Sequence, residues 1–213
     1  MMWLFRTLLG LLIGASVGGC AVAGVIADKF APPPTDPAAY KLAQQPTLVM
    51  VENFQNPDLV EVHAERLDRD ISNELIEHKI APVIKPQRLM ELKASKGPAF
   101  GQMDIPAVAK SLGARQVVYV DLVKFSVGPP PGSDMVKGEA EALVKVVDDG
   151  GRTLWPRESS LGRQVKCQTP YLRTDSGVDE SAVREQMYQK LTDQVARLFY
   201  DAPVDDKPEV PEP

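Results

Sequence analysis

The chain contains few residues that could do chemistry. It has two histidines and two cysteines among 213 residues, whereas a metal site needs several such ligands, or carboxylates, close together. His63 and His78 both fall in a segment with helical spacing, where a separation of fifteen residues corresponds to about 22 Å along the helix axis. They therefore cannot share a metal ion. We expect both to be ordinary surface histidines, and no metal or cofactor site is predicted.

The sequence does not predict a catalytic nucleophile. Ser159-Ser160-Leu161-Gly162 lacks the first glycine of a nucleophile elbow, and no histidine follows it in the chain. We therefore interpret it as a loop. Cys167 is expected to be a small packed residue on or beside a strand, with a reactive thiol as the alternative.

The remaining candidates have structural explanations. Asp148-Asp149-Gly150-Gly151 is typical of a hairpin turn, and no EF-hand spacing follows it. Gly128–Gly132 encloses three prolines, which lack the N–H groups that bind phosphate, so we expect a connection or a rigid contact surface. Met187, Tyr188 and Trp155 are expected in the core rather than around a ligand. The chain is therefore not expected to be an enzyme.

Cys20 is the residue whose neighbours predict a chemical role. Arg6 precedes an apolar run, and Val17-Gly18-Gly19 stands directly before the cysteine. This order of basic, apolar and small residues is typical of a secretory signal. It also resembles the lipobox of bacterial lipoproteins, with Val17 in place of the usual Leu and Gly18 in place of the usual Ala or Ser. The resemblance implies cleavage after residue 19 and lipid attachment, including palmitate, at Cys20.

Two other interpretations of this segment remain open. Leu8–Ala27 is free of charge and close to the ~20 residues that span a bilayer as a helix. An uncleaved anchor would keep Arg6 on the cytoplasmic side, and the domain behind it could then be a periplasmic small-molecule or lipid-binding protein. A plain signal peptide is the third interpretation. All three export the rest of the chain.

Composition divides the chain into four parts. Residues 1–19 are the expected signal peptide, 20–46 the lipid anchor and a proline-rich linker, 47–201 one domain, and 202–213 a disordered tail rich in proline and acidic residues. The formal net charge is −5, so no basic excess predicts nucleic-acid binding. With one other cysteine besides Cys20, a disulfide framework is excluded.

Hydrophobic periodicity predicts the elements of the domain. Asp104 is expected to cap a helix that ends at Gly113. Gln116–Val127 is expected to form a central strand, with Phe125 on the same face as Tyr119. Lys96–Gly101 is expected to be a loop. Strands are expected at 47–52, 81–84, 116–127, 137–147, 152–155 and 161–168, and helices at 59–78, 86–95, 104–111 and 183–199. The fold class is therefore α/β (α+β): a single mixed sheet of about four to six strands, covered by two long and two short helices.

Three stretches resemble one family of bacterial envelope proteins: Val49–Phe54, Val83–Leu89 and Ala109–Val118. Its members include the periplasmic domain of the curli secretion channel, the lipoprotein activator of a penicillin-binding protein and the amino-terminal domain of the Tol-Pal translocation protein. The likeness covers roughly Thr47–Phe199.

The resemblance implies a non-catalytic lipoprotein that assembles with, or activates, envelope machinery. The expected partners are the membrane, through Cys20, and an envelope protein or further copies of this chain. Ala21 stands where an Asp retains lipoproteins at the inner membrane of enteric bacteria. By resemblance to that sorting rule, the expected location is the periplasmic side of the outer membrane.

Overall fold

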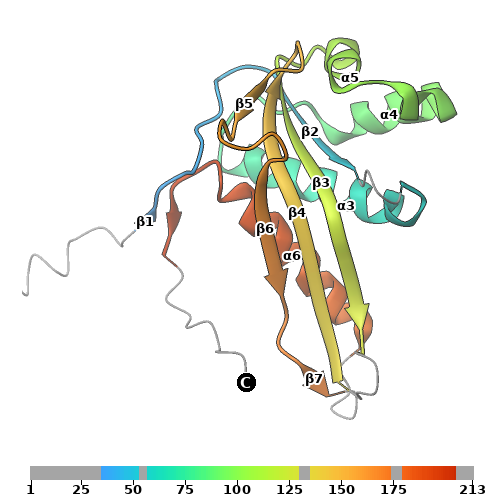
Figure 1. The fold of residues 1–213 in the computed structure, drawn as a ribbon, viewed down its shortest axis with the longest axis vertical. Helices are drawn as coiled ribbons and strands as arrows, with labels where there is room; N and C mark the ends of the chain where they lie inside the picture. Colours follow the sequence, from blue (N-terminus) through green and yellow to red (C-terminus); the bar gives the residue numbers. More distant parts are fainter. Residues whose placement is uncertain (1–34, 53–56, 130–134, 174–178, 205–213) are drawn as a thin grey trace, which may run out of the picture. The chain divides into compact units, whose positions relative to one another are not determined.

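The computed structural model describes residues 35–52, 57–129, 135–173 and 179–204, with no side-chain description for 57–61 (Figure 1). The chain divides into two compact units. The larger is Pro37–Ala202. The smaller takes in residues up to Asp36 and from Pro203 onward. Of the smaller unit, the structure describes strand β1 (Thr35–Asp36) and the end of β8 (Ala202–Pro203), which form a two-stranded sheet.

The larger unit is built on a mixed six-stranded sheet with the order β2-β3-β4-β5, in which β6 and β7 also pair with β4. β2 runs parallel to β3, and the other pairs are antiparallel. The strands are β2 (Thr47–Glu52), β3 (Gln116–Gly128), β4 (Met135–Asp148), β5 (Thr153–Trp155), β6 (Arg163–Gln168) and β7 (Leu172–Arg173). The predicted α/β (α+β) class with one mixed sheet is confirmed.

Four α-helices and one 3-10 helix are described in this unit. They are α3 (Pro57–Glu77), α4 (Pro86–Lys96), η1 (Gly97–Gln102), α5 (Ile105–Leu112) and α6 (Glu180–Ala196). Two long and two short α-helices are thus confirmed. Residues 96–101 were predicted to be a loop, but they are helical. Lys96 is the last residue of α4, and the 3-10 helix η1 follows it directly. Gly97-Pro98 suits this arrangement, because proline is tolerated in the first turn of a helix.

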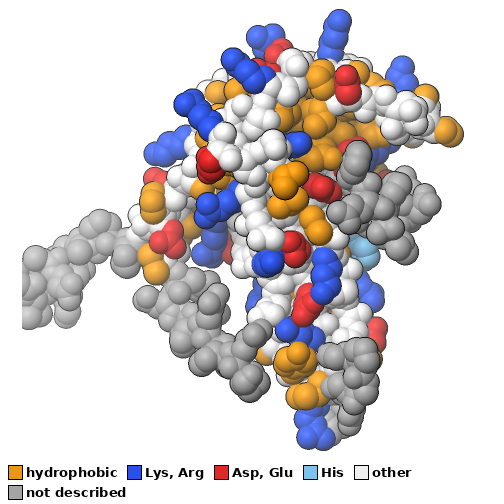
Figure 2. All heavy atoms as spheres, in the orientation of Figure 1, with side chains coloured by type: hydrophobic (Ala, Val, Ile, Leu, Met, Phe, Trp, Pro, Cys, Tyr) orange, Lys and Arg blue, Asp and Glu red, His pale blue; other side chains and the backbone are white. Residues whose placement is uncertain are grey.

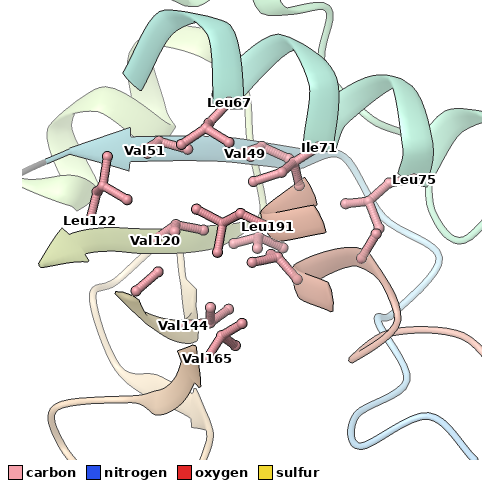
Figure 3. Packing of buried hydrophobic residues seen from close by; sticks show 14 of the residues in the cluster. Val49, Val51, Leu67, Ile71, Leu75, Val120, Leu122, Val144, Val165 and Leu191 are labelled. Atoms are coloured by element: carbon pink, nitrogen blue, oxygen red, sulfur yellow. The ribbon is translucent and has the colours of Figure 1, made fainter. Parts of the chain in front are cut away.

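The larger core lies between the sheet and helices α3 and α6. Apolar residues at helical spacing on α3, among them Leu67, Ile71 and Leu75, are fully buried. Figure 3 shows Leu67 and Ile71 over the alternate residues Val51 and Val49 of β2, with Leu75 farther along α3 and Leu191 of α6 alongside. Burying a side chain of this size contributes about 1.5–3 kcal/mol, so this layer holds the two long helices on the sheet.

A second core covers the opposite face of β2 and β3. Its buried residues include Leu48 and Met50 of β2, Leu89 of α4 and Val108 of α5. Both faces of the parallel strand pair are therefore covered, as predicted for the apolar run around Val117. Farther along β4, buried Ala and Val alternate with partly exposed residues, as the sequence pattern predicted.

Local signals end the short helix α5 where predicted. The Asp104 side chain accepts a hydrogen bond from the Ala107 N–H at 2.8 Å, and Gly113 takes the left-handed conformation with φ 74°. Because glycine has no Cβ, this conformation costs it little. The predicted hairpin turn is also confirmed: the Asp148 side chain accepts from the Gly150 and Arg152 N–H groups.

Phe125 lies on the opposite face of β3 from the predicted one. The register between β3 and β4 shifts between Leu122 and Lys124. An extra residue in one strand inverts the alternation of every side chain beyond it. Phe125 therefore packs with Leu122 against the larger core, not with Tyr119.

The predicted strand at 81–84 is reduced to a single bridge. Thr47 donates to the Pro82 carbonyl and accepts from the Ile84 N–H, both at 2.8 Å, and Val83 pairs with Thr47. Pro82 has no N–H to donate, and Pro86 begins α4 directly afterwards. The ladder therefore cannot extend.

Residues 37–46 were assigned to the linker from their composition, but they belong to the larger compact unit. Leu42 is buried in the larger core, and the Tyr40 N–H donates to the Leu198 carbonyl at 2.9 Å. The Gln116 side-chain amide donates to the Ala43 carbonyl at 2.8 Å and to Thr47 Oγ1 at 2.7 Å. The buried Leu42 side chain and these hydrogen bonds hold residues 37–46 on the domain, and a proline-rich composition does not indicate such contacts.

Candidate functional site

The predicted lipid attachment site, Cys20, lies outside the described residues, and so do Leu8–Ala27 and most of Gly128–Gly132. The structure therefore reports on the domain that Cys20 would anchor. Within the described ranges, none of the helices combines the length and apolar character that crossing a bilayer requires.

The two histidines occupy different surroundings on α3, and one differs from its prediction. His78 is exposed, stacks on Tyr200 with ring centroids 3.9 Å apart, and pairs with Glu74 at 3.2 Å. His63 is not an ordinary surface histidine. Its Nδ1 is hydrogen-bonded to the Tyr188 hydroxyl at 2.6 Å, and its ring stacks on Phe125 at 4.5 Å.

The environment of His63 lowers its basicity. Burial, followed by the positive charge of Arg184, lowers the pKa of His63. Phe125 reaches this cluster because of the shift in the β3–β4 register. Arg66 lies over the Tyr188 ring at 5.2 Å and pairs with Glu185 at 2.7 Å. These contacts join α3 to α6, so the cluster has a structural role.

The candidate nucleophiles are placed as predicted. Cys167 lies on β6, buried, and burial raises the pKa of its thiol to about 11. It is therefore a packed thiol that is protonated at neutral pH. Ser159 lies in a loop, where the Gly162 N–H donates to its hydroxyl at 3.4 Å. Met187 and Tyr188 are buried in the core, and Trp155 packs against it.

A polar cluster that we did not predict from the sequence lies at the carboxyl end of β2. Asp68, on α3, is 5% exposed, and its Oδ1 accepts a hydrogen bond from the Val51 N–H at 2.7 Å. Lys93, on α4, approaches its Oδ2 at 3.7 Å. The neighbouring Glu52 accepts from the Tyr119 hydroxyl at 3.3 Å. The Asp68 cluster, defined as these residues, thus joins two helices to two strands.

Burial determines the protonation of this cluster. It raises the pKa of Asp68 to about 7, against the opposing charge of Lys93. Burial also raises the pKa of Glu52, again opposed by Lys93, and it raises the pKa of Tyr119. A carboxyl group with a pKa near 7 could exchange protons as a general acid or base. The two oxygens of Asp68 contact the Val51 N–H and the Lys93 ammonium group, and these contacts link α3 to β2 and α4.

The sequence did contain a signal for Asp68. Asp68 follows Ala64 by four residues and precedes Ser72 by four, so all three share one side of α3. This line lies beside the apolar stripe of Leu67 and Ile71, and all three of its members are buried. A carboxylate bordering the apolar face of an expected helix therefore indicates a buried partner elsewhere in the chain.

Within the described residues, no group of three or more His, Cys, Asp or Glu side chains is arranged to hold a metal ion. The polar groups of the Asp68 cluster contact one another, and so do those around His63, namely Tyr188, Arg66 and Glu185. These contacts connect α3 with α6, and α3 with β2 and α4.

Comparison with known proteins finds no family and no curated protein that matches the sequence. Among solved structures, lipoprotein GNA1162 from Neisseria meningitidis matches at 16% identity with a TM-score of 0.45, covering 71% of this chain and 98% of that one. A PelC dodecamer from Paraburkholderia phytofirmans matches at 14% identity with a TM-score of 0.41, covering 77% and 91%.

A minor lipoprotein from Acinetobacter baumannii matches at 8% identity with a TM-score of 0.35, covering 76% of this chain and 100% of that one. Likenesses at these identities and TM-scores do not assign the chain to the family of any of these proteins.

Proposed function

We propose that this chain is an exported, lipid-anchored protein of the bacterial cell envelope, and that its α/β domain is a non-catalytic module that binds an envelope protein or further copies of itself. The observation that supports the anchor is the sequence before Cys20: a basic residue, an apolar run and Val17-Gly18-Gly19 in the order a lipoprotein signal requires. In this proposal the domain faces the periplasm from the outer membrane.

The arrangement of the described side chains supports a non-catalytic domain. The His63 ring is engaged by Tyr188, and both oxygens of Asp68 are engaged by other elements of the fold. The Cys167 thiol is buried and protonated. A catalytic group has to be within hydrogen-bond reach of a substrate, and these three groups are committed to structure instead.

A membrane anchor suits a module of this kind. Tethering confines the domain to the layer next to the membrane, which raises its effective concentration toward membrane-bound partners without any new contact. A tether therefore has a direct benefit for a protein that works by binding.

Crosslinking in intact cells of the native bacterium tests the proposal. The wild-type chain is expected to give a reproducible adduct with one envelope protein or with itself, and Cys20→Ala is expected to reduce it strongly because the domain loses its confinement. Cys167→Ala is the matched control, since it removes the other cysteine and leaves the anchor. Failure to find any reproducible adduct, or an enzymatic activity abolished by one substitution in the domain, would contradict the proposal.

A further inference from the structure

Charge is unevenly distributed along the domain. Residues 79–115, here called the basic lobe, comprise α4, η1, α5 and the adjoining turns. This segment holds seven Lys and Arg residues and two acidic residues, whereas the whole chain has 24 Lys+Arg and 29 Asp+Glu. The basic lobe is therefore strongly positive within a protein that is negative as a whole. A concentration of one sign on one part of a surface is typical of a site for a partner of the opposite sign.

Most of the positive charge of the basic lobe is available to solvent. Five of its cations are exposed and form no ion pair with a described residue: Lys79, Lys85, Arg88, Lys96 and Lys110. Two acidic groups at its border are paired with its other two cations. Asp68 pairs with Lys93, and Asp149 pairs with Arg115 at 3.0 Å. These two acidic groups thus pair with Lys93 and Arg115 and not with the five exposed cations.

Apolar side chains lie among these cations. Met90 on α4 is 44% exposed. Five more residues of the lobe are only partly buried against the second core: Ile84, Leu92, Phe100, Met103 and Ile105. Figure 2 shows Lys and Arg side chains along the upper rim, where Figure 1 places α5 of the lobe and, outside the lobe, the β4–β5 turn, with an apolar area beside them. Basic and apolar side chains side by side are the combination that favours binding to a membrane surface.

We propose that the basic lobe docks on the anionic headgroup surface of the membrane to which the chain is tethered. This inference rests on the proposed anchor. Residues 21–36 separate Cys20 from the compact unit, and sixteen residues span at most about 55 Å. The tether therefore keeps the domain close to the headgroups. Each Lys or Arg near an anionic surface favours association with it, and clusters of about four to eight are typical of anionic lipid recognition.

The bilayer fits the lobe better than an acidic protein does for two reasons. The tether guarantees that the bilayer is present, and the lobe presents dispersed lysines on two helices and their turns rather than a cleft. Lysine is a compact charge on a flexible stem, which suits a fluid surface of headgroups more than a fixed bidentate partner.

Lysine footprinting on vesicles tests this proposal. The full lipidated chain is reconstituted into vesicles of phosphatidylcholine alone, or with about 30% phosphatidylglycerol, and the rate of lysine acylation is read residue by residue by mass spectrometry. Lys85 and Lys96 report on the lobe. Lys41 and Lys166, which are also exposed, report on the rest. On anionic vesicles, the rates at the two lobe lysines should fall roughly threefold or more, while those at the two outer lysines stay equal.

Matched variants test whether charge causes the protection. R88Q/K110Q removes two lobe cations and should reduce the protection of Lys85 and Lys96 at least by about half. R157Q/R163Q removes two exposed arginines outside the lobe and should leave the protection unchanged. High salt, about 1 M, should abolish it, because the Debye length falls to about 3 Å.

The outcomes separate this proposal from the proposed anchor. If the chain does not float with either kind of vesicle, the anchor fails and the docking proposal fails with it. If it floats but labels equally on both kinds, only the docking proposal is overturned. Protection of Lys85 and Lys96 that is seen in whole envelopes but not on anionic vesicles would assign the lobe to an acidic protein and would also overturn it.

Discussion

Replacing Asp68 with Asn should flatten the pH dependence of the domain's stability. Asp68 is fully enclosed between α3, β2 and α4, and burial raises its pKa from 3.8 to about 7. A group whose pKa is higher in the folded than in the unfolded state contributes stability that is complete below the unfolded value and is lost as the pH rises through the folded value. Asp68 therefore favours folding at pH 5 and contributes almost nothing at pH 8.

The size of the effect follows from these two pKa values. At roughly 1.4 kcal/mol per pKa unit, the contribution of Asp68 to stability falls by about 2–3 kcal/mol between pH 5 and pH 8. Asn keeps an oxygen that can accept from the Val51 N–H but does not titrate. The difference in free energy of unfolding between the wild type and Asp68→Asn should thus change by about 2–3 kcal/mol over this range, in favour of the wild type at low pH.

Urea unfolding followed by circular dichroism at pH 5, 6, 7 and 8 measures this difference. Lys93→Met provides a second variant, because the Lys93 charge lowers the pKa of Asp68. Without that charge, the loss of stability should move to higher pH. Parallel curves for the wild type and Asp68→Asn across the whole range would refute the reasoning, since Asp68 would then not titrate as a buried group.

Two further predictions concern single buried positions. Gly138→Ala should destabilise the domain by about 1–3 kcal/mol, because the new Cβ would lie 2.4 Å from Met187 Cγ. Gly101→Ala is the control, since a Cβ there would have nothing within 4 Å. Equal melting temperatures of the two variants would contradict the packing around Gly138. Cys167 should react with a maleimide only at the rate of unfolding, because its thiol is buried and protonated at neutral pH; rapid labelling of the native protein, followed by mass spectrometry, would show otherwise.

The sequence predicted those elements whose signals are local. The cap at Asp104 and the glycine at position 113 define α5 within the chain itself, and the alternation in β4 depends on successive residues alone. The hairpin turn at Asp148 is likewise specified by adjacent residues. These predictions succeeded because neither the partner of an element nor its register was needed.

Features that depend on pairing between distant segments were missed. The face of Phe125 depends on one extra residue in the β3–β4 register, which alternation along one strand does not reveal. His63 then lies against Phe125 and Tyr188, so its partly buried position follows from the same shift. Asp68 needs Val51 and Lys93, which come from two other elements. The sequence shows that such a carboxylate needs a partner but not which one.

The intact mass of the mature chain tests the central claim, which is that Cys20 is a lipid-bearing amino terminus. We predict that the wild type and Cys167→Ala both begin at Cys20 and carry acyl mass increments, while Cys20→Ala carries none. A wild-type chain that retains Leu8–Ala27, or that has the same mass increments after Cys20→Ala, would contradict the claim.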